Sequence, residues 1–122
     1  MTNDPIVAAS MQILLGSGDA RKLAAEAVAA LAVPDFDLSE ERLDAAQAKL
    51  KAAHAVHTDI IQSEAGGEGS QIGFPVLFSH AQDTMMSTDS EIKSARRLVP
   101  VVRGLHDRLA AVEAVLAAEV AR

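Results

Sequence analysis

The residues best suited to chemistry in this sequence are His80 and Asp83, which lie in the run His80-Ala81-Gln82-Asp83. A histidine ring can act as a nucleophile or bind a metal, and a carboxylate can bind a hard cation. In a helix, residues three positions apart share a face, so the ring and the carboxylate would project toward a common partner or axis. The pair indicates phosphate chemistry or metal chemistry, and its spacing alone does not decide between them.

The composition restricts the class of protein. A chain of 122 residues predicts a single domain over residues 1–122, and 49% hydrophobic residues with only 2% aromatic residues predict a core of Ala, Leu, Val and Ile. This composition favours closely packed helices over a sheet. The net charge of -6 argues against a nucleic-acid partner, and the absence of cysteine excludes disulfides, thiolate metal sites and a cysteine nucleophile.

Signals for secretion or membrane insertion are missing from the sequence. Residues 1–5 are polar and lack the basic start and apolar stretch of a signal peptide. Charged residues such as Arg21, Lys22 and Glu26 interrupt the apolar stretches, which stay below the roughly 20 residues of a membrane span. We expect a soluble, cytoplasmic protein with no direct membrane insertion.

The first predicted helix covers about residues 5–32 and opens with Pro5 at its first position. Its apolar stripe consists of Ala20, Leu23, Ala27 and Leu31. The Gly16-Ser17-Gly18 run predicts a bend or loosening of this helix, because glycine lowers helix stability. The following residues do not fit a phosphate-binding loop, since no strand precedes them and the Lys-Ser/Thr pair is out of register.

The second predicted helix follows Asp37-Leu38-Ser39-Glu40, which has the form of a capping box. Its apolar residues alternate steps of three and four, as in the seam of a helical bundle. They are Leu43, Ala46, Leu50, Ala53, His57 and Ile60. The glycine-rich residues 65–70 predict a flexible connection to the next helix.

The third predicted helix is opened by Pro75 and runs nearly to the C-terminus. Its apolar stripe consists of Leu77, Ala81, Thr88, Ile92, Ala95, Val102, Leu105, Leu109, Val112 and Leu116. Two features interrupt this pattern. Residues 88–91 form a second capping-box pattern, so a helix could also begin there, and Pro100 predicts a kink near residues 96–99, beyond which the chain diverges from the bundle.

A polar stripe with short side chains runs beside the apolar one. It consists of His80, Asp83, Ser87, Ser90 and Ser94. A solvent-facing stripe in an acidic chain usually carries longer Lys and Glu side chains, whereas these short ones allow another helix to approach closely. We therefore favour a helix–helix interface here over simple exposure to water.

The chain resembles the enzyme IIA component of the lactose, cellobiose and chitobiose branch of the bacterial phosphoenolpyruvate-dependent sugar phosphotransferase system. The resemblance covers about residues 6–99 and is most specific at His80-Ala81-Gln82-Asp83. The matching segments are Gly18-Asp19-Ala20-Arg21, Ala53-His54, Thr58-Asp59-Ile60-Ile61-Gln62-Ser63-Glu64-Ala65 and Ser79-His80-Ala81-Gln82-Asp83.

The resemblance implies an all-α fold, an antiparallel three-helix protomer that assembles into a homotrimer of nine helices. It also implies that His80 accepts a phosphoryl group from the general histidine phosphocarrier protein and passes it to a cysteine of the cognate enzyme IIB. The sugar would be a β-linked disaccharide. Asp83 matches the residue that gathers with its symmetry mates around a divalent cation, Mg²⁺ or another, on the trimer axis.

The sequence departs from the family at Thr84, where the common motif continues with a second histidine. The competing interpretation is a helical interaction module that keeps the fold and has lost phosphoryl transfer. A histidine phosphotransfer domain of two-component signalling fits less well, because Asp83 and Thr84 stand where its motif has Lys and Gly.

The remaining histidines receive different expectations. His57 lies on the seam of the second helix and is interpreted as a hydrogen-bonded core residue. His54 matches a family position and lies one turn away from His57, which leaves open a place near the phosphate or in a two-histidine metal site. His106 is expected on the surface, and Met85 and Met86 are expected to serve in packing.

Overall fold

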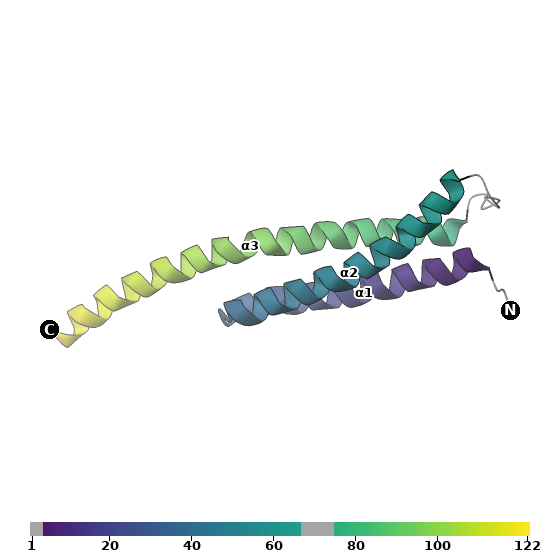
Figure 1. Ribbon diagram of the computed structural model, residues 1–122. Coiled ribbons are helices and arrows are strands. Elements are labelled where there is room, and N and C mark those ends of the chain that lie inside the picture. The colour runs from purple at the N-terminus through teal and green to yellow at the C-terminus, as the bar shows by residue number, and fades with distance from the viewer. Residues whose placement is uncertain (1–3, 67–74) are drawn as a thin grey trace.

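Residues 4–66 and 75–122 are described by a computed structural model, and they form three α-helices. These are α1 (Pro5–Ala32), α2 (Phe36–Ala65) and α3 (Val76–Ala121). Figure 1 shows that each helix runs antiparallel to the next, so the expected all-α, antiparallel three-helix protomer is confirmed. A flexible connection was predicted at residues 65–70, and residues 67–74 lie outside the described residues.

The first helix begins where its capping chemistry places it. An Asp4 carboxylate oxygen accepts a hydrogen bond from the Ile6 amide at 2.8 Å, and Pro5 occupies the first helical position, where its missing N–H costs nothing. The helix then continues without a break to Ala32. The bend predicted at residues 16–18 is therefore wrong.

Packing against α2 explains why glycine stands at position 16. A Cβ added to Gly16 would lie 3.3 Å from the Cβ of Ala53 and 3.5 Å from the carbonyl oxygen of Lys49. Gly16 therefore allows α1 and α2 to approach closely, whereas a Cβ on Gly18 would meet nothing within 4 Å. The close approach of two helices, rather than a bend in one, is the structural role of the first glycine.

Small side chains fill most of the core between the three helices. Among residues 4–66 and 75–122, Ile13, Leu43 and Ile92 are the largest fully buried apolar residues, and the Phe78 ring is buried slightly less deeply. Around them lie many alanines, as the composition predicted. The buried alanines are Ala9, Ala20, Ala24, Ala27, Ala30, Ala46, Ala53, Ala81 and Ala95.

The second helix starts earlier than the sequence suggested. Asp35 is its N-cap, since its carboxylate accepts a hydrogen bond from the Leu38 amide at 3.0 Å. Ser39 is already inside the helix and fully buried, so the cap predicted at residues 37–40 was misplaced. The predicted seam is confirmed, with its first four residues, Leu43 to Ala53, buried and with His57 and Ile60 half-buried.

The third helix is continuous through both predicted interruptions. The Thr88 hydroxyl donates to the carbonyl oxygen of Thr84 at 2.7 Å, one turn earlier, instead of capping a new helix. Pro100 lies inside the helix. Figure 1 shows that the C-terminal part of α3 continues past the ends of α1 and α2 and curves toward the side on which they lie. The predicted change of direction is therefore present as a curve in an unbroken helix, and it does not turn α3 away from the other two helices.

The last part of α3 extends past the ends of α1 and α2, as Figure 1 shows. The predicted apolar stripe is buried or half-buried up to Val102, whereas every side chain from Arg103 to Arg122 is exposed. Leu105, Leu109 and Leu116 are each more than half exposed. We name residues 103–122 the α3 extension.

Among the helices that the structure describes, none is long and apolar enough to cross a membrane.

The two glycines of α1 provide a matched test of this packing. Gly18→Ala should raise the free energy of unfolding by about 1 kcal/mol, because alanine favours the helix and the added methyl group meets open space. Gly16→Ala should raise the free energy of unfolding by less, or should lower it, because the added methyl group crowds Ala53. Urea denaturation followed by circular dichroism, at one protein concentration, measures both values; equal gains for the two variants would contradict the close approach.

Candidate functional site

His80 is exposed on the second turn of α3. The helix begins after Pro75, which caps it without a side-chain hydrogen bond. The helix dipole favours negative charge at the end of the bundle where His80 lies, and the first backbone N–H groups of α3 point toward that end. An exposed imidazole beside a helix N-terminus is suited to carry a phosphoryl group that another protein must reach.

The whole polar stripe predicted from the sequence lies on the surface of the single chain. Asp83, Ser87, Ser90 and Ser94 are exposed, as is His80. Residues 4–66 and 75–122 contain no group of three His, Cys, Asp or Glu side chains able to hold a metal ion. In one chain, Asp83 therefore offers a single exposed carboxylate, and a metal site built on it would require further copies of the chain.

Thr84 faces its own helix. Its hydroxyl donates to the carbonyl oxygen of His80 at 2.9 Å, so this side chain is engaged with the backbone of the preceding turn. The residue that stands in place of the family's second histidine is thus hydrogen-bonded to the backbone carbonyl of His80.

Arg21 of α1 ties the middle of the polar stripe to the bundle. Its guanidinium donates to the Ser87 hydroxyl at 2.7 Å and to the Glu91 carboxylate at 2.9 Å. Ser87 lies seven residues after His80, about 10 Å along the helix axis. The sequence identified Arg21 as a charge within an apolar stretch and as part of a matching segment. Its contacts with α3 join residues that are 66 and 70 positions apart in the chain, and such contacts cannot be predicted from a local pattern.

Gln82 and His57 form a separate contact between α2 and α3. The His57 Nε2 and the Gln82 Oε1 are 2.8 Å apart, which requires the tautomer with a proton on Nε2. The His57 ring also stacks on Phe78, with centroids 5.3 Å apart and planes within 5°. His57 makes the hydrogen bond expected of it, with Gln82 turned toward it, but it is half-buried and does not lie in the core as expected.

The other histidines and the methionines have simpler surroundings. His54 is exposed, with its Nδ1 3.3 Å from the Thr58 hydroxyl and its ring 6.1 Å from that of His57. His106 is exposed as expected and makes an edge contact with Phe36 at 5.7 Å. Met85 is buried in the core, whereas Met86 is 59% exposed, so the packing role expected for both is confirmed only for Met85.

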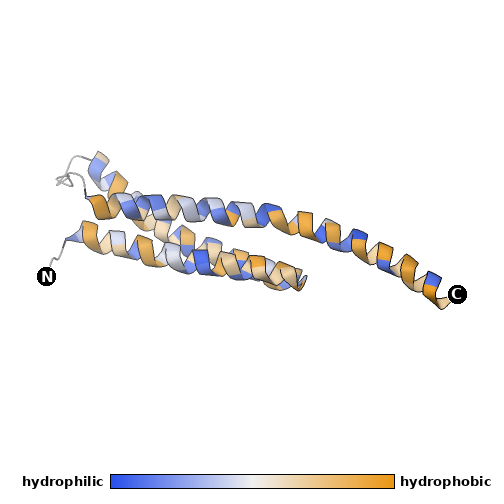
Figure 2. Cartoon of the chain, turned by 180° about the vertical axis from the view of Figure 1, so that it is seen from behind, coloured by the Kyte–Doolittle hydropathy of each residue, from blue (hydrophilic) through white to orange (hydrophobic). Residues whose placement is uncertain are grey.

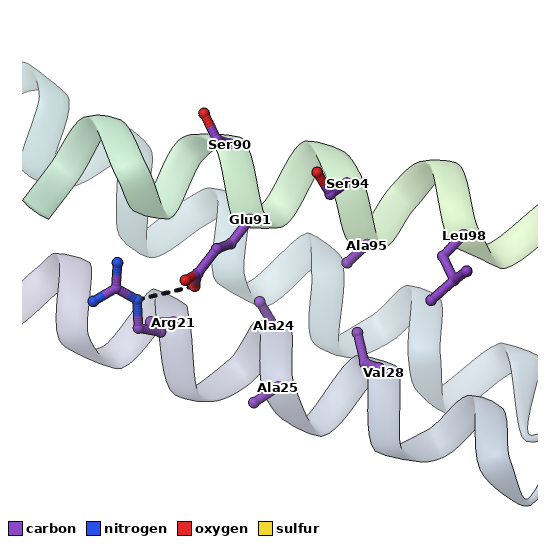
Figure 3. Close-up of a pocket in the computed structure, with 9 residues that line it drawn as sticks. All are labelled: Arg21, Ala24, Ala25, Val28, Ser90, Glu91, Ser94, Ala95 and Leu98. Atoms are coloured by element: carbon purple, nitrogen blue, oxygen red, sulfur yellow. Dashed lines mark hydrogen bonds and ion pairs between the residues drawn. The ribbon is translucent and has the colours of Figure 1, made fainter.

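A groove lies between α1 and α3, directly beside the polar stripe. It has a volume of about 840 Å³ and is shown in Figure 3. Five of its lining residues are alanine, valine or leucine side chains from the two helices, with the Arg21–Glu91 ion pair at one end. The lining residues are Arg21, Ala24, Ala25, Val28, Ser90, Glu91, Ser94, Ala95 and Leu98. The polar stripe and this groove together form one surface with short side chains.

Comparison with known families and proteins shows what this chain is similar to. A family model described as "PTS system, Lactose/Cellobiose specific IIA subunit" matches residues 8–103. The chain is 32% identical to the cellobiose-specific EIIA component of Lactococcus lactis over 92% of this chain and 91% of that protein. It is 29% identical to the lactose-specific EIIA component of Lacticaseibacillus casei, over 87% and 93% of the two chains.

Solved structures agree with these relatives. The crystal structure of PtcA from S. mutans has a TM-score of 0.78 and 30% identity, covering 84% of this chain and 99% of that one. The cellobiose-specific enzyme IIA from Bacillus anthracis has a TM-score of 0.80 and 29% identity, covering 88% and 94%.

These matches define the class of the protein, a phosphotransferase component with a three-helix fold. The chain belongs to the lactose/cellobiose-specific IIA family of the phosphotransferase system (PTS). The family resemblance seen in the sequence is thereby confirmed. The family model ends at residue 103, whereas the alignment with the Lactococcus lactis relative covers 112 residues and therefore continues into the α3 extension.

The contact between His57 and Gln82 can be measured with a double-mutant cycle. We expect Gln82→Leu and His57→Leu each to lower the free energy of unfolding, because each leaves the other polar group half-buried without its partner. The double variant should be more stable than the sum of the single effects predicts, by about 0.5–1.5 kcal/mol. Thermal and urea unfolding give the coupling, and strictly additive effects would contradict the hydrogen bond.

Proposed function

We propose that this chain is the phosphocarrier, or enzyme IIA, component of a sugar PTS, with His80 as the phosphorylated residue. The observation that carries the proposal is the exposed imidazole of His80, at the N-terminal end of α3 and inside the segment that matches the IIA family. A carrier must meet two different proteins in turn, so its reactive nitrogen has to lie on the surface.

The proposed donor is the phosphohistidine of the general phosphocarrier protein, HPr. The P–N bond of the donor breaks as a new P–N bond forms to a ring nitrogen of His80, and the donor histidine recovers its lone pair. One solved structure that shares this fold at 24% identity, with a TM-score of 0.71, is the complex of IIA(Chitobiose) with HPr from Escherichia coli. That likeness supports the fold alone, and the partner is proposed here from the family.

The proposed acceptor is a cysteine of the cognate enzyme IIB. The P–N bond at His80 breaks as a P–S bond forms, which leaves the imidazole free for the next cycle. Phosphoryl transfer needs mainly positioning and charge stabilisation. The backbone N–H groups at the start of α3 would supply part of that stabilisation. We propose a β-linked disaccharide as the sugar and the cytoplasm as the location.

Thr84 differs from the histidine that the common motif carries at this position. Its hydroxyl donates a hydrogen bond to the His80 carbonyl oxygen, so it is directed at the helix backbone. The backbone amides of α3 and a partner protein are left to orient the phosphoryl group.

We also propose that three copies of the chain assemble with their polar stripes facing a common axis. The short side chains of the stripe and the neighbouring groove, about 840 Å³ in volume, would let the α3 helices approach closely. Three Asp83 carboxylates near that axis would repel one another unless a cation lay between them. Their oxygens fit a hard divalent cation such as Mg²⁺, which would neutralise the charge and hold the copies together.

Phosphoryl transfer to His80 can be tested directly with labelled phosphoenolpyruvate, purified enzyme I and HPr. The wild-type chain should take up acid-labile label, and His80→Gln should take up none while folding normally, because His80 is exposed. His57→Gln is the matched control and should still be labelled, because His57 is engaged with Gln82 and Phe78.

Two results would count against this assignment. Loss of label in His57→Gln with retention in His80→Gln would move the acceptor to His57. No label on folded wild-type protein, with a known IIA labelled in parallel, would indicate a helical interaction module that has lost transfer.

The cation at Asp83 can be tested by analytical ultracentrifugation. A chelator should weaken the wild-type trimer, whereas Asp83→Leu should assemble with or without chelator because the like charges are gone. Asp89→Asn is the control, since Asp89 pairs with Lys93 at 2.8 Å, and its assembly should stay sensitive to the chelator. A wild-type trimer that the chelator leaves unchanged would overturn the role of Asp83.

A further inference from the structure

The turns of α3 that follow His80 carry several hydroxyl groups that are hydrogen-bonded to the helix itself. Figure 2 shows that α3, after its first turn, is mostly pale or blue where it lies along the bundle. The hydroxyls of Thr84, Ser87 and Thr88 each donate to a carbonyl oxygen of the preceding turn. Hydrogen bonds of this kind compete with the backbone ladder and often bend a helix, so the geometry of these turns depends on which hydroxyls are held in place.

Thr84 connects these hydroxyls to His80. Its own hydroxyl donates to the His80 carbonyl oxygen at 2.9 Å. Its carbonyl oxygen accepts from the Ser87 hydroxyl at 3.1 Å and from the Thr88 hydroxyl at 2.7 Å. The Thr88 side chain is fully buried, so packing restricts it, whereas Ser87 is exposed. The direction of the Ser87 hydroxyl therefore depends on a further partner.

Arg21 is that partner, and it comes from α1. Its guanidinium donates to the Ser87 oxygen at 2.7 Å and to the Glu91 carboxylate at 2.9 Å. Figure 3 shows the Arg21 side chain reaching from α1 toward α3, with its link to Glu91. A serine hydroxyl has one hydrogen, and because Arg21 occupies the oxygen as a donor, that hydrogen is left to point at the Thr84 carbonyl. Arg21 thus fixes which hydrogen bond the Ser87 hydroxyl makes.

These contacts form a continuous chain of hydrogen bonds from α1 to the His80 backbone. It runs from Arg21 to Ser87, from Ser87 to the Thr84 carbonyl, and from the Thr84 hydroxyl to the His80 carbonyl. His80, Thr84 and Ser87 are four and three positions apart, so they share the flank of α3 that lies next to α1. The chain spans about 10 Å along the helix axis. A change at Arg21 can therefore reach His80 without direct contact.

We propose that Arg21 is a positioning residue for phosphoryl transfer, which sets the geometry of the His80 turn through Ser87 and Thr84. This inference rests on the proposed role of His80 as the carrier residue. The rate of a transfer reaction depends strongly on where the reacting atoms lie, and a displacement of about 1 Å can cost on the order of a hundredfold. The chain holds the backbone from which the His80 ring projects, and it does not touch the phosphoryl group.

Substitutions that remove or keep single hydrogen bonds of the chain test this role. Arg21→Met, Ser87→Ala and Thr84→Val should each lower the maximal rate of transfer from phosphorylated HPr about three- to tenfold, with KM for HPr unchanged. Ser87→Thr and Thr84→Ser keep the hydroxyls and should react at nearly the wild-type rate. Glu91→Gln is the matched control, because it removes the charge paired with Arg21 and leaves the chain intact. Rapid-quench kinetics at several HPr concentrations measure both constants, and circular dichroism confirms folding.

A double variant shows whether the residues act as one unit. Arg21→Met combined with Thr84→Val should be no slower than the slower single variant, since both changes break the same chain. Losses that multiply in the double variant, an equal loss in Glu91→Gln, or a change in KM alone would each overturn the proposal.

The NMR signal of the His80 ring reports on the chain without any transfer. The Cε1–Hε1 signal should move in Arg21→Met and in Thr84→Val, and it should stay near its wild-type position in Glu91→Gln. An unmoved signal in the first two variants would overturn the positioning role even if the wild type takes up label. A wild-type chain that shows these shifts and takes up no label would instead contradict the carrier function on which the positioning role rests.

Discussion

The structure depends on the close approach of three alanine-rich helices. Large side chains are few, so the core gains stability from many short contacts that require the backbones to lie near one another. Gly16 against Ala53 is the clearest case, since a single added carbon would lie 3.3 Å from its neighbour. This packing holds α3 firmly along its first half and so fixes the orientation of everything that α3 presents.

The helix α3 serves several purposes at different positions along its length. Its first turns present His80 and Asp83, the turns that follow carry the serine stripe beside the groove, and the α3 extension continues past the ends of α1 and α2. One face of the helix is used for the core, with Phe78, Ala81, Met85 and Thr88 directed inward. Because the helix is continuous, the directions of the carrier site and of the proposed trimer axis are coupled.

Much of the fold followed from sequence periodicity, and the errors share a physical cause. Gly16, Thr88 and Asp37 were all interpreted from local helix propensities and caps, which predicted a bend, a new helix start and a cap. The bend predicted at Gly16 is absent because that residue packs closely against α2. Thr88 does not start a new helix, since its hydroxyl donates a hydrogen bond to the preceding turn. Asp35 caps α2 in place of Asp37. Local signals identify where a helix is able to stop, and packing decides whether it does.

The helical class, the seam of α2 and the candidate residues His80 and Asp83 could be predicted from the amino-acid sequence, because period and residue type are local properties of a chain. The folded molecule was needed to show that Arg21 reaches Ser87 and Glu91, that Gln82 turns to His57, and that the apolar pattern after Val102 is exposed. These facts depend on contacts between residues distant in the chain and on the unequal lengths of the packed helices. A hydrophobic period predicts a face that can be buried, and the arrangement of the helices decides whether that face is covered within the chain.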